Sequence, residues 1–224
     1  MVHKRIIFSG GGDERDSRPL DEIFAGWVGM GRMLYLPTAL VRPSNIQAGV
    51  RWIKQVFTPL GIKKIEAWET LLDKSASKLA SFDAVYIGGG NTFYLLQQLR
   101  RYKLDLALDD FIQQGKPVYG GSAGAIVLGY DITSCAHIDE NIIGLTDYSG
   151  MDLALGYTIW CHYTPEDEAR IRAYVDRTGI PSIAAGERAG VSREGDHLYA
   201  QGFEPVVHFT QQDQEVIPPG TRIV

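Results

Sequence analysis

Three glycine clusters punctuate the first half of the sequence, and each directly follows a short apolar run. The clusters consist of Gly10 to Gly12, Gly88 to Gly90, and Gly120, Gly121 and Gly124. Glycine adopts positive φ angles and allows other atoms to approach its backbone closely. The clusters therefore predict turns at the ends of strands, where a tight bend or contact with a ligand is required.

Apolar runs and helical stretches alternate through this part of the chain. Runs rich in Ile, Val and Tyr predict buried strands at residues 5–9, 33–37, 63–68, 84–87 and 117–120. Helical spacing occupies residues 20–28, 44–60, 71–79, 92–101 and 104–114, and Ser44 is placed to cap the second of these helices. This order predicts a parallel sheet with helices on both faces.

The second half of the chain is less regular. Residues 131–150 are too long for an ordinary connection and predict a functional loop. Strand character resumes at residues 158–161, and a helix is expected from Thr164, its hydroxyl cap, to about Arg177, with Gly179 ending it.

The last quarter of the chain predicts hairpins. From Ile183 onward, short strands are separated by turns at residues 194–196 and 201–202, which indicate antiparallel hairpins closing the sheet. We therefore expect residues 1–224 to form one domain. Its predicted fold is α/β and three-layered, with a mostly parallel sheet, helices on both faces and C-terminal antiparallel hairpins.

Composition excludes several classes of protein. With 22 Lys and Arg against 27 Asp and Glu, the net charge is −5, so binding to nucleic acid or to a membrane is not expected. Cys135 and Cys161 are too few for a disulfide framework and lack the spacing of common zinc sites. The N-terminal apolar run is too short for a signal peptide. We expect a cytoplasmic protein without a metal or other cofactor.

The segment Tyr119-Gly-Gly-Ser122-Ala-Gly-Ala125 contains a GxSxG pattern between a predicted strand and an apolar helix. A strand-to-helix turn of this kind, a nucleophile elbow, exposes the serine hydroxyl at the edge of a sheet. The helix that follows directs its first amides and its positive dipole end toward the same point. Ser122 is therefore the candidate nucleophile.

The segment Tyr86-Ile-Gly-Gly-Gly-Asn-Thr92 also follows a strand and opens a helix. Its simplest use beside Ser122 is an oxyanion hole, in which an amide of Gly89 or Gly90 joins the amide of Ala123. Phosphate binding is disfavoured because both GxxxxGK(S/T) and GxGxxG are missing.

A serine nucleophile requires a base and a group that orients the base. His162 is the best candidate for the base because it follows a predicted strand and precedes a capped helix. Glu187, just after another strand, is the preferred acidic member, since a strand end positions a group more tightly than a loop. Glu140, in the long loop, is the alternative.

These motifs resemble those of the peptidase E family, which includes aspartyl dipeptidases and cyanophycinases and whose fold is related to class I glutamine amidotransferases. The resemblance rests on GGSAGA around Ser122, YIGGGNT around Gly89 and CHYTPED around His162. It implies a serine peptidase of dipeptidase or exopeptidase type acting on small peptides, and it leaves a homodimer open. For the acidic member, a dipeptidase pattern indicates Glu187 and a cyanophycinase pattern indicates Glu140.

The segment after His162 departs from the aspartyl dipeptidase pattern. That pattern implies a basic residue that recognises an N-terminal aspartate, whereas this sequence has Glu166, Asp167 and Glu168 there, and Arg170 and Arg172 follow only later. Carboxylates near the site would repel an acidic side chain. We therefore expect a neutral or basic substrate residue rather than aspartate.

Two other functions fit parts of the pattern. An α/β-hydrolase-type esterase shares GxSxG but orders its triad Ser, acid, His, which would require Asp176 or Asp196 followed by His208. A non-catalytic amidotransferase-like binding domain is the other alternative, because a fold does not determine function.

Overall fold

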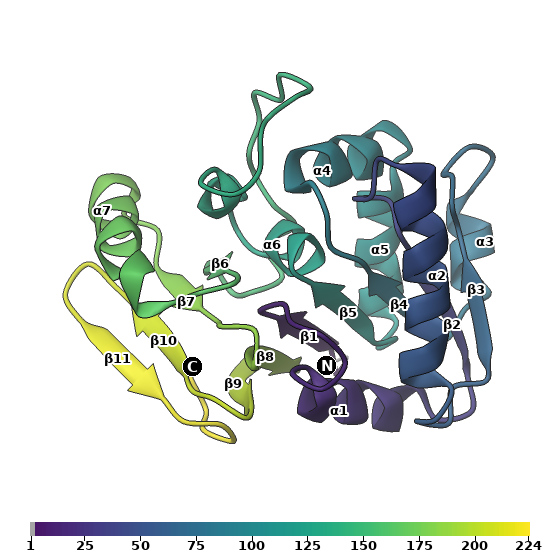
Figure 1. The fold of residues 1–224 in the computed structure, drawn as a ribbon, viewed down its shortest axis with the longest axis horizontal. Coiled ribbons are helices and arrows are strands. Elements are labelled where there is room, and N and C mark those ends of the chain that lie inside the picture. Colours follow the sequence, from purple (N-terminus) through teal and green to yellow (C-terminus); the bar gives the residue numbers. More distant parts are fainter. Residues whose placement is uncertain (1–2) are drawn as a thin grey trace.

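The computed structural model describes residues 3–224, which form two neighbouring β-sheets with helices packed on them (Figure 1). A seven-stranded sheet has the order β3-β2-β4-β5-β1-β8-β9, and a four-stranded sheet has the order β11-β10-β7-β6. The strands are β1 (Arg5–Ser9), β2 (Arg32–Leu36), β3 (Lys64–Ala67), β4 (Ala84–Ile87), β5 (Val118–Gly121), β6 (Thr158–Trp160), β7 (Ser182–Ala184), β8 (Ala189–Glu194), β9 (His197–Gly202), β10 (Val206–Phe209) and β11 (Gln214–Ile217).

The larger sheet is parallel from β3 to β1 and antiparallel from β1 through β8 to β9. All five strands predicted in the first half form, with bounds within one residue of the prediction. Because β1, β4 and β5 are parallel and lie in the centre of this sheet, the three glycine clusters that follow them meet at one edge.

Helices cover both faces of the larger sheet, as predicted. The helices are α1 (Arg18–Val28), α2 (Pro43–Phe57), α3 (Ala76–Ala80), α4 (Thr92–Arg101), α5 (Leu104–Gln113), α6 (Ala123–Leu128) and α7 (Glu168–Thr178), with 3-10 turns at Thr133–Cys135 and Pro165–Asp167. On β1, Ile7 packs with α1 and α2, whereas Phe8 packs with α4, α5 and α6. None of the helices in residues 3–224 has the length and apolarity needed to cross a membrane.

Several helix starts differ from the prediction; α1, for example, begins at Arg18 rather than at residue 20. Helix α2 begins at Pro43 after Arg42, so Ser44 lies inside the helix and does not cap it. Helix α3 is shorter than predicted and begins at Ala76, where the Ser75 side chain accepts a hydrogen bond from the backbone of Lys78. Helix α2 thus starts at a proline and α3 at a serine cap, and apolar spacing alone did not indicate either position.

The four-stranded sheet was not predicted as a separate unit. The turn at residues 194–196 does join a hairpin, β8–β9, but residues 201–202 belong to β9, and β10 pairs with β7 and β11 instead. The free edge of β9 is occupied by the C-terminal segment: Ala200 and Leu198 form backbone hydrogen bonds with Gly220, Thr221, Ile223 and Val224. Strand β10 therefore has no edge of β9 to join, and the prediction of a second hairpin at residues 201–202 is wrong.

Candidate active site

Ser122 lies at the junction of β5 and α6, between a buried strand and a buried helix. Its backbone has φ 51° and ψ −113°, a conformation that is strained for a residue with a side chain. Its amide donates a hydrogen bond to the carbonyl of Ser9, 3.1 Å away, which ties the turn to β1. A Cβ on Gly124 would lie 2.2 Å from the Ile87 carbonyl oxygen, so only glycine allows this close packing.

His162 lies beside the Ser122 hydroxyl. Its Nε2 atom is 2.8 Å from Ser122 Oγ, a hydrogen-bond distance. His162 also has a positive φ, 55°, and its amide donates to the carbonyl of Gly10 at 2.8 Å. His162 follows β6, which belongs to the smaller sheet, whereas a single sheet was predicted. The contact between His162 and Ser122 therefore joins the ends of strands from two sheets.

The glycine cluster after β1, to which sequence analysis gave no function, packs against the His162 ring. A Cβ on Gly11 would lie 2.3 Å from His162 Cε1, and Gly11 has φ +134°. Both features require glycine at this position. The cluster follows a strand that is parallel to β5, and this order could have predicted that it lies at the same edge of the sheet as Ser122.

The two candidate carboxylates occupy different positions. Glu187 Oε1 lies 3.4 Å from His162 Nδ1, the ring nitrogen opposite the one that faces Ser122, and the Glu187 side chain is 59% exposed. Glu140 is exposed, and its backbone carbonyl accepts a hydrogen bond from the Asn91 side chain. Within residues 3–224 its carboxylate forms no hydrogen bond or ion pair. The structure thus brings Glu187, and not Glu140, to the histidine.

Of the three residues predicted for an oxyanion hole, Gly89 and Ala123 lie next to the serine, whereas Gly90 packs against Ala39. A Cβ on Gly89 would lie 3.2 Å from Ser122 Cβ and 3.6 Å from its Oγ, so the backbone of this turn runs next to the hydroxyl. The amides of Gly89 and Gly90 donate to no acceptor within residues 3–224. Ala123 is the first residue of α6, where an amide has no acceptor inside the helix.

A cavity of about 150 Å³ opens beside Ser122 and His162. Apart from these two residues and the glycine turns, its walls are aromatic and hydroxyl side chains that sequence analysis did not identify: Ser9, Ser17, Tyr35, Trp52 and Tyr86. Tyr35 and Tyr86 lie near the ends of the parallel strands β2 and β4, and this position in the sequence could have indicated that they lie close to Ser122. Among residues 3–224, no Lys or Arg lines this cavity.

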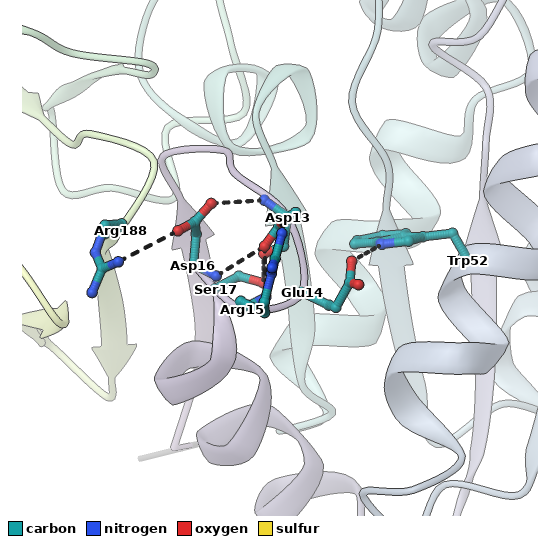
Figure 2. Close-up of polar contacts among 7 residues, drawn as sticks. All are labelled: Asp13, Glu14, Arg15, Asp16, Ser17, Trp52 and Arg188. Atoms are coloured by element: carbon teal, nitrogen blue, oxygen red, sulfur yellow. Dashed lines mark hydrogen bonds and ion pairs between the residues drawn. The ribbon is translucent and has the colours of Figure 1, made fainter.

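The loop between β1 and α1 contacts Arg188 on one side and Trp52 on the other (Figure 2). Asp16 forms an ion pair at 3.7 Å with Arg188, the residue that follows Glu187 in the sequence. Glu14 accepts a hydrogen bond from Trp52 Nε1 at 3.0 Å. Asp13 forms an ion pair with Arg15 within the loop. The loop therefore links the segment that holds Glu187 to the helix that holds Trp52.

The acidic segment after His162 does not line the cavity, contrary to its predicted effect on substrate. Asp167 bonds to the Thr164 amide at its own helix start and pairs with Arg170. Glu168 accepts a hydrogen bond from the Tyr163 hydroxyl at 3.1 Å. These carboxylates are thus held by local partners, and repulsion of an acidic substrate side chain cannot be attributed to them.

The other nucleophile and base candidates lie elsewhere. Cys161 is buried, with its Sγ 3.6 Å from the carbonyls of Ser9 and Ser122, and burial raises the pKa of its thiol. His208 lies on β10, packs against Tyr157 with ring centroids 5.2 Å apart, and has its pKa lowered by burial. Neither arrangement provides an activated group next to Ser122. Residues 3–224 contain no cluster of three or more side chains suited to hold a metal ion.

Solved structures share this fold. A putative peptidase E protein from Listeria monocytogenes EGD-e superposes with a TM-score of 0.73 at 22% identity, covering 91% of this chain and 100% of that chain. A peptidase from an acI-B1 Actinobacterium superposes with a TM-score of 0.78 at 19% identity, covering 99% and 97%. These likenesses confirm the predicted α/β fold.

Sequence comparison identifies relatives called Peptidase E. That of Shewanella baltica (strain OS185) is 33% identical over 152 residues, and that of Shewanella oneidensis is 30% identical over 156 residues. The first match covers 63% of this chain and 63% of the relative, so the chain spans less than two thirds of that relative's length. The sequence model of peptidase family S51 matches residues 6–199, which is most of the chain. The chain therefore belongs to peptidase family S51.

Proposed function

We propose that the protein is a serine peptidase that hydrolyses small peptides, with Ser122 as nucleophile, His162 as base and Glu187 as the group that orients the base. The observation that carries the proposal is the 2.8 Å contact between Ser122 Oγ and His162 Nε2 at a strained strand-to-helix turn. A hydroxyl becomes nucleophilic when an adjacent base can accept its proton, and this contact supplies such a base.

In the first half of the reaction, Ser122 Oγ attacks the carbonyl carbon of a peptide bond while its proton passes to His162 Nε2. The oxygen of the tetrahedral intermediate accepts hydrogen bonds from the amides of Ala123 and of Gly89 or Gly90. The C–N bond then breaks as the imidazolium donates its proton to the leaving amine, which leaves an ester between Ser122 and the acyl group.

In the second half, His162 takes a proton from water, and the resulting hydroxide attacks the ester. When the second tetrahedral intermediate collapses, Ser122 Oγ leaves, regains its proton from His162, and the acid product departs. Glu187 near Nδ1 favours the tautomer that keeps Nε2 free to accept the serine proton, and it stabilises the imidazolium formed in each half.

A serine-directed probe tests the nucleophile directly. We expect a fluorophosphonate to label the protein with one equivalent, and peptide mapping by mass spectrometry to place the label on Ser122, because an activated hydroxyl reacts and ordinary serines do not. Active protein should also release amino acids from dipeptides. Intact protein that neither reacts with the probe nor hydrolyses any dipeptide would favour the alternative of a non-catalytic binding domain.

Exchanging each candidate carboxylate for its amide separates the two acidic residues. We expect Glu187→Gln to lower kcat by about 10²-fold, less than for a buried triad aspartate, because the exposed Glu187 is partly screened by water. Glu140→Gln is the matched control and should leave kcat within about twofold, since a solvated surface charge contributes little. Steady-state kinetics on one dipeptide measures both. The assignment is wrong if Glu140→Gln causes the larger loss.

A further inference from the structure

We propose that the cavity beside Ser122 is a specificity pocket for a neutral, apolar side chain of about the size of phenylalanine or leucine, carried by the residue whose carbonyl is attacked. This inference rests on the proposed function. The acidic segment after His162 does not line the cavity and has no part in it. The pocket is inferred from the walls, the charges and the size of the cavity.

The walls of the cavity are aromatic rings that brace one another. The Tyr86 ring packs edge-on against Tyr35, with centroids 5.8 Å apart, and against Trp52, with centroids 6.2 Å apart. Tyr35 and Tyr86 are 3% and 5% exposed, and the hydrogen bond from Trp52 Nε1 to Glu14 fixes the third ring. Rings held in this way form a fixed wall beside the nucleophile, which does not have to reorganise when a ligand binds.

Besides Ser122, two serines and two tyrosines bring hydroxyl groups to the cavity. Burial raises the pKa of Tyr35 and of Tyr86, so these two hydroxyls are uncharged, and the serine hydroxyls already have partners. Ser17 Oγ donates to the Asp13 carbonyl at 3.0 Å and lies 2.9 Å from Asp21 Oδ2. Ser9 Oγ donates to the Gly11 carbonyl at 3.4 Å. The polar groups of these serines therefore stabilise the wall of the cavity and are not free to recognise a charged substrate side chain.

The charges around the cavity disfavour an acidic side chain. No Lys or Arg lines it, and the nearby Arg15 and Arg188 are paired with Asp13 and Asp16 in the loop (Figure 2). Behind Ser17 lies Asp21, whose pKa is raised to about 7 by burial, so this group is either neutral or negative and never a counter-ion for a carboxylate. A substrate aspartate would be buried here without a positive partner, which proteins avoid.

The size of the cavity suits one apolar side chain. Its volume of about 150 Å³ equals that of an engineered apolar cavity known to accept benzene. A phenyl ring or an isobutyl group would fill such a space, whereas alanine would leave most of it empty. Ser122 lines this cavity, and in the proposed complex the cavity holds the side chain of the residue whose carbonyl Ser122 attacks.

Binding without turnover tests the pocket. In Ser122→Ala protein, calorimetry with Phe-Ala, Leu-Ala and Asp-Ala should show that Phe-Ala and Leu-Ala bind at least about tenfold more tightly than Asp-Ala. Adding Trp52→Ala should lower the affinity for Phe-Ala by about tenfold and leave that for Ala-Ala within about twofold, since only the larger side chain reaches the indole. Trp52→Phe should retain most of the preference. The matched control is Tyr130→Ala, which removes a ring that is 44% exposed and not part of the cavity.

The outcomes separate the pocket from the proposed catalysis. Equal or tighter binding of Asp-Ala, binding of none of the dipeptides, or a loss in the Trp52→Ala background that is the same for Phe-Ala and Ala-Ala would each overturn the pocket. If wild-type protein hydrolyses nothing while Ser122→Ala protein still prefers Phe-Ala, the pocket stands and the peptidase function fails.

Discussion

Replacing Ser122 with alanine should lower kcat/KM for dipeptide hydrolysis by about 10⁴- to 10⁶-fold, the range found when a catalytic serine is removed from a serine peptidase. Within residues 3–224, Ser122 Oγ is the hydroxyl that contacts the His162 ring, and the nearby Ser9 and Ser17 hydroxyls bond to the carbonyls of Gly11 and Asp13. The fold should be kept, because alanine fits wherever serine does and the Ser122 amide still bonds to β1. Circular dichroism and thermal unfolding would verify this alongside the kinetics.

The control for this experiment is Ser44→Ala, the same change at an exposed position on α2 that does not cap the helix. Its activity and its stability should match those of the wild type. A Ser122→Ala protein that is folded and retains a tenth or more of the wild-type rate would refute the mechanism, because no acyl-enzyme could form in it.

The elements of the larger sheet could be predicted because their signals are local. Apolar runs such as 84–87 and helical spacing such as 92–101 correspond to β4 and α4, whose bounds match the prediction. The context of Ser122 was also local, since strand, small residues and helix follow one another within ten residues. Patterns of this kind depend only on the order of nearby residues, so they can be recognised without knowing the fold.

The rest depended on contacts between distant segments. Residues 220–224 pair with the outer edge of β9, while β10 pairs with β7 and β11 in the smaller sheet, and no property of β9 or β10 indicates this on its own. The cavity is assembled from β1, β2, β4, β5 and α2, so the contribution of Trp52 becomes visible only when its helix is placed. The place of Glu166, Asp167 and Glu168 could not be predicted for the same reason: they are close to His162 in sequence but do not line the cavity.

The glycine clusters show how local signals combine into a site. The sequence predicted each cluster as a turn after a strand. The clusters lie together because β4, β5 and β1 are neighbours in one parallel sheet. At the shared edge, Gly11 makes room for the His162 ring, Gly89 runs next to the serine, and Gly124 lets the turn pack against β4. These glycines thus lie where three backbone turns approach Ser122 and His162.

Replacing His162 should have an effect close to that of replacing Ser122, and it decides between the two orders of triad. Without the imidazole 2.8 Å from Ser122 Oγ, the hydroxyl keeps its proton at neutral pH, so His162→Gln should lower kcat by about 10⁴- to 10⁶-fold and abolish labelling by fluorophosphonate. The α/β-hydrolase order assigns this duty to His208 instead. That residue packs on Tyr157 in the smaller sheet, so His208→Gln should keep labelling and kcat within about threefold, even if loss of a half-buried ring costs some stability.

Rates of labelling and of dipeptide hydrolysis, measured on both variants at one pH, give the decision. Loss in His162→Gln alone supports the pair found at the meeting of the two sheets, whereas loss in His208→Gln alone would mean that Ser122 is activated from a strand the geometry places elsewhere. Loss in both, with both proteins folded, would show that the smaller sheet acts on Ser122 through the position of β6 as well as through the imidazole. That coupling has a path in the structure, because β10 pairs with β7 and β7 pairs with β6, whose end carries His162.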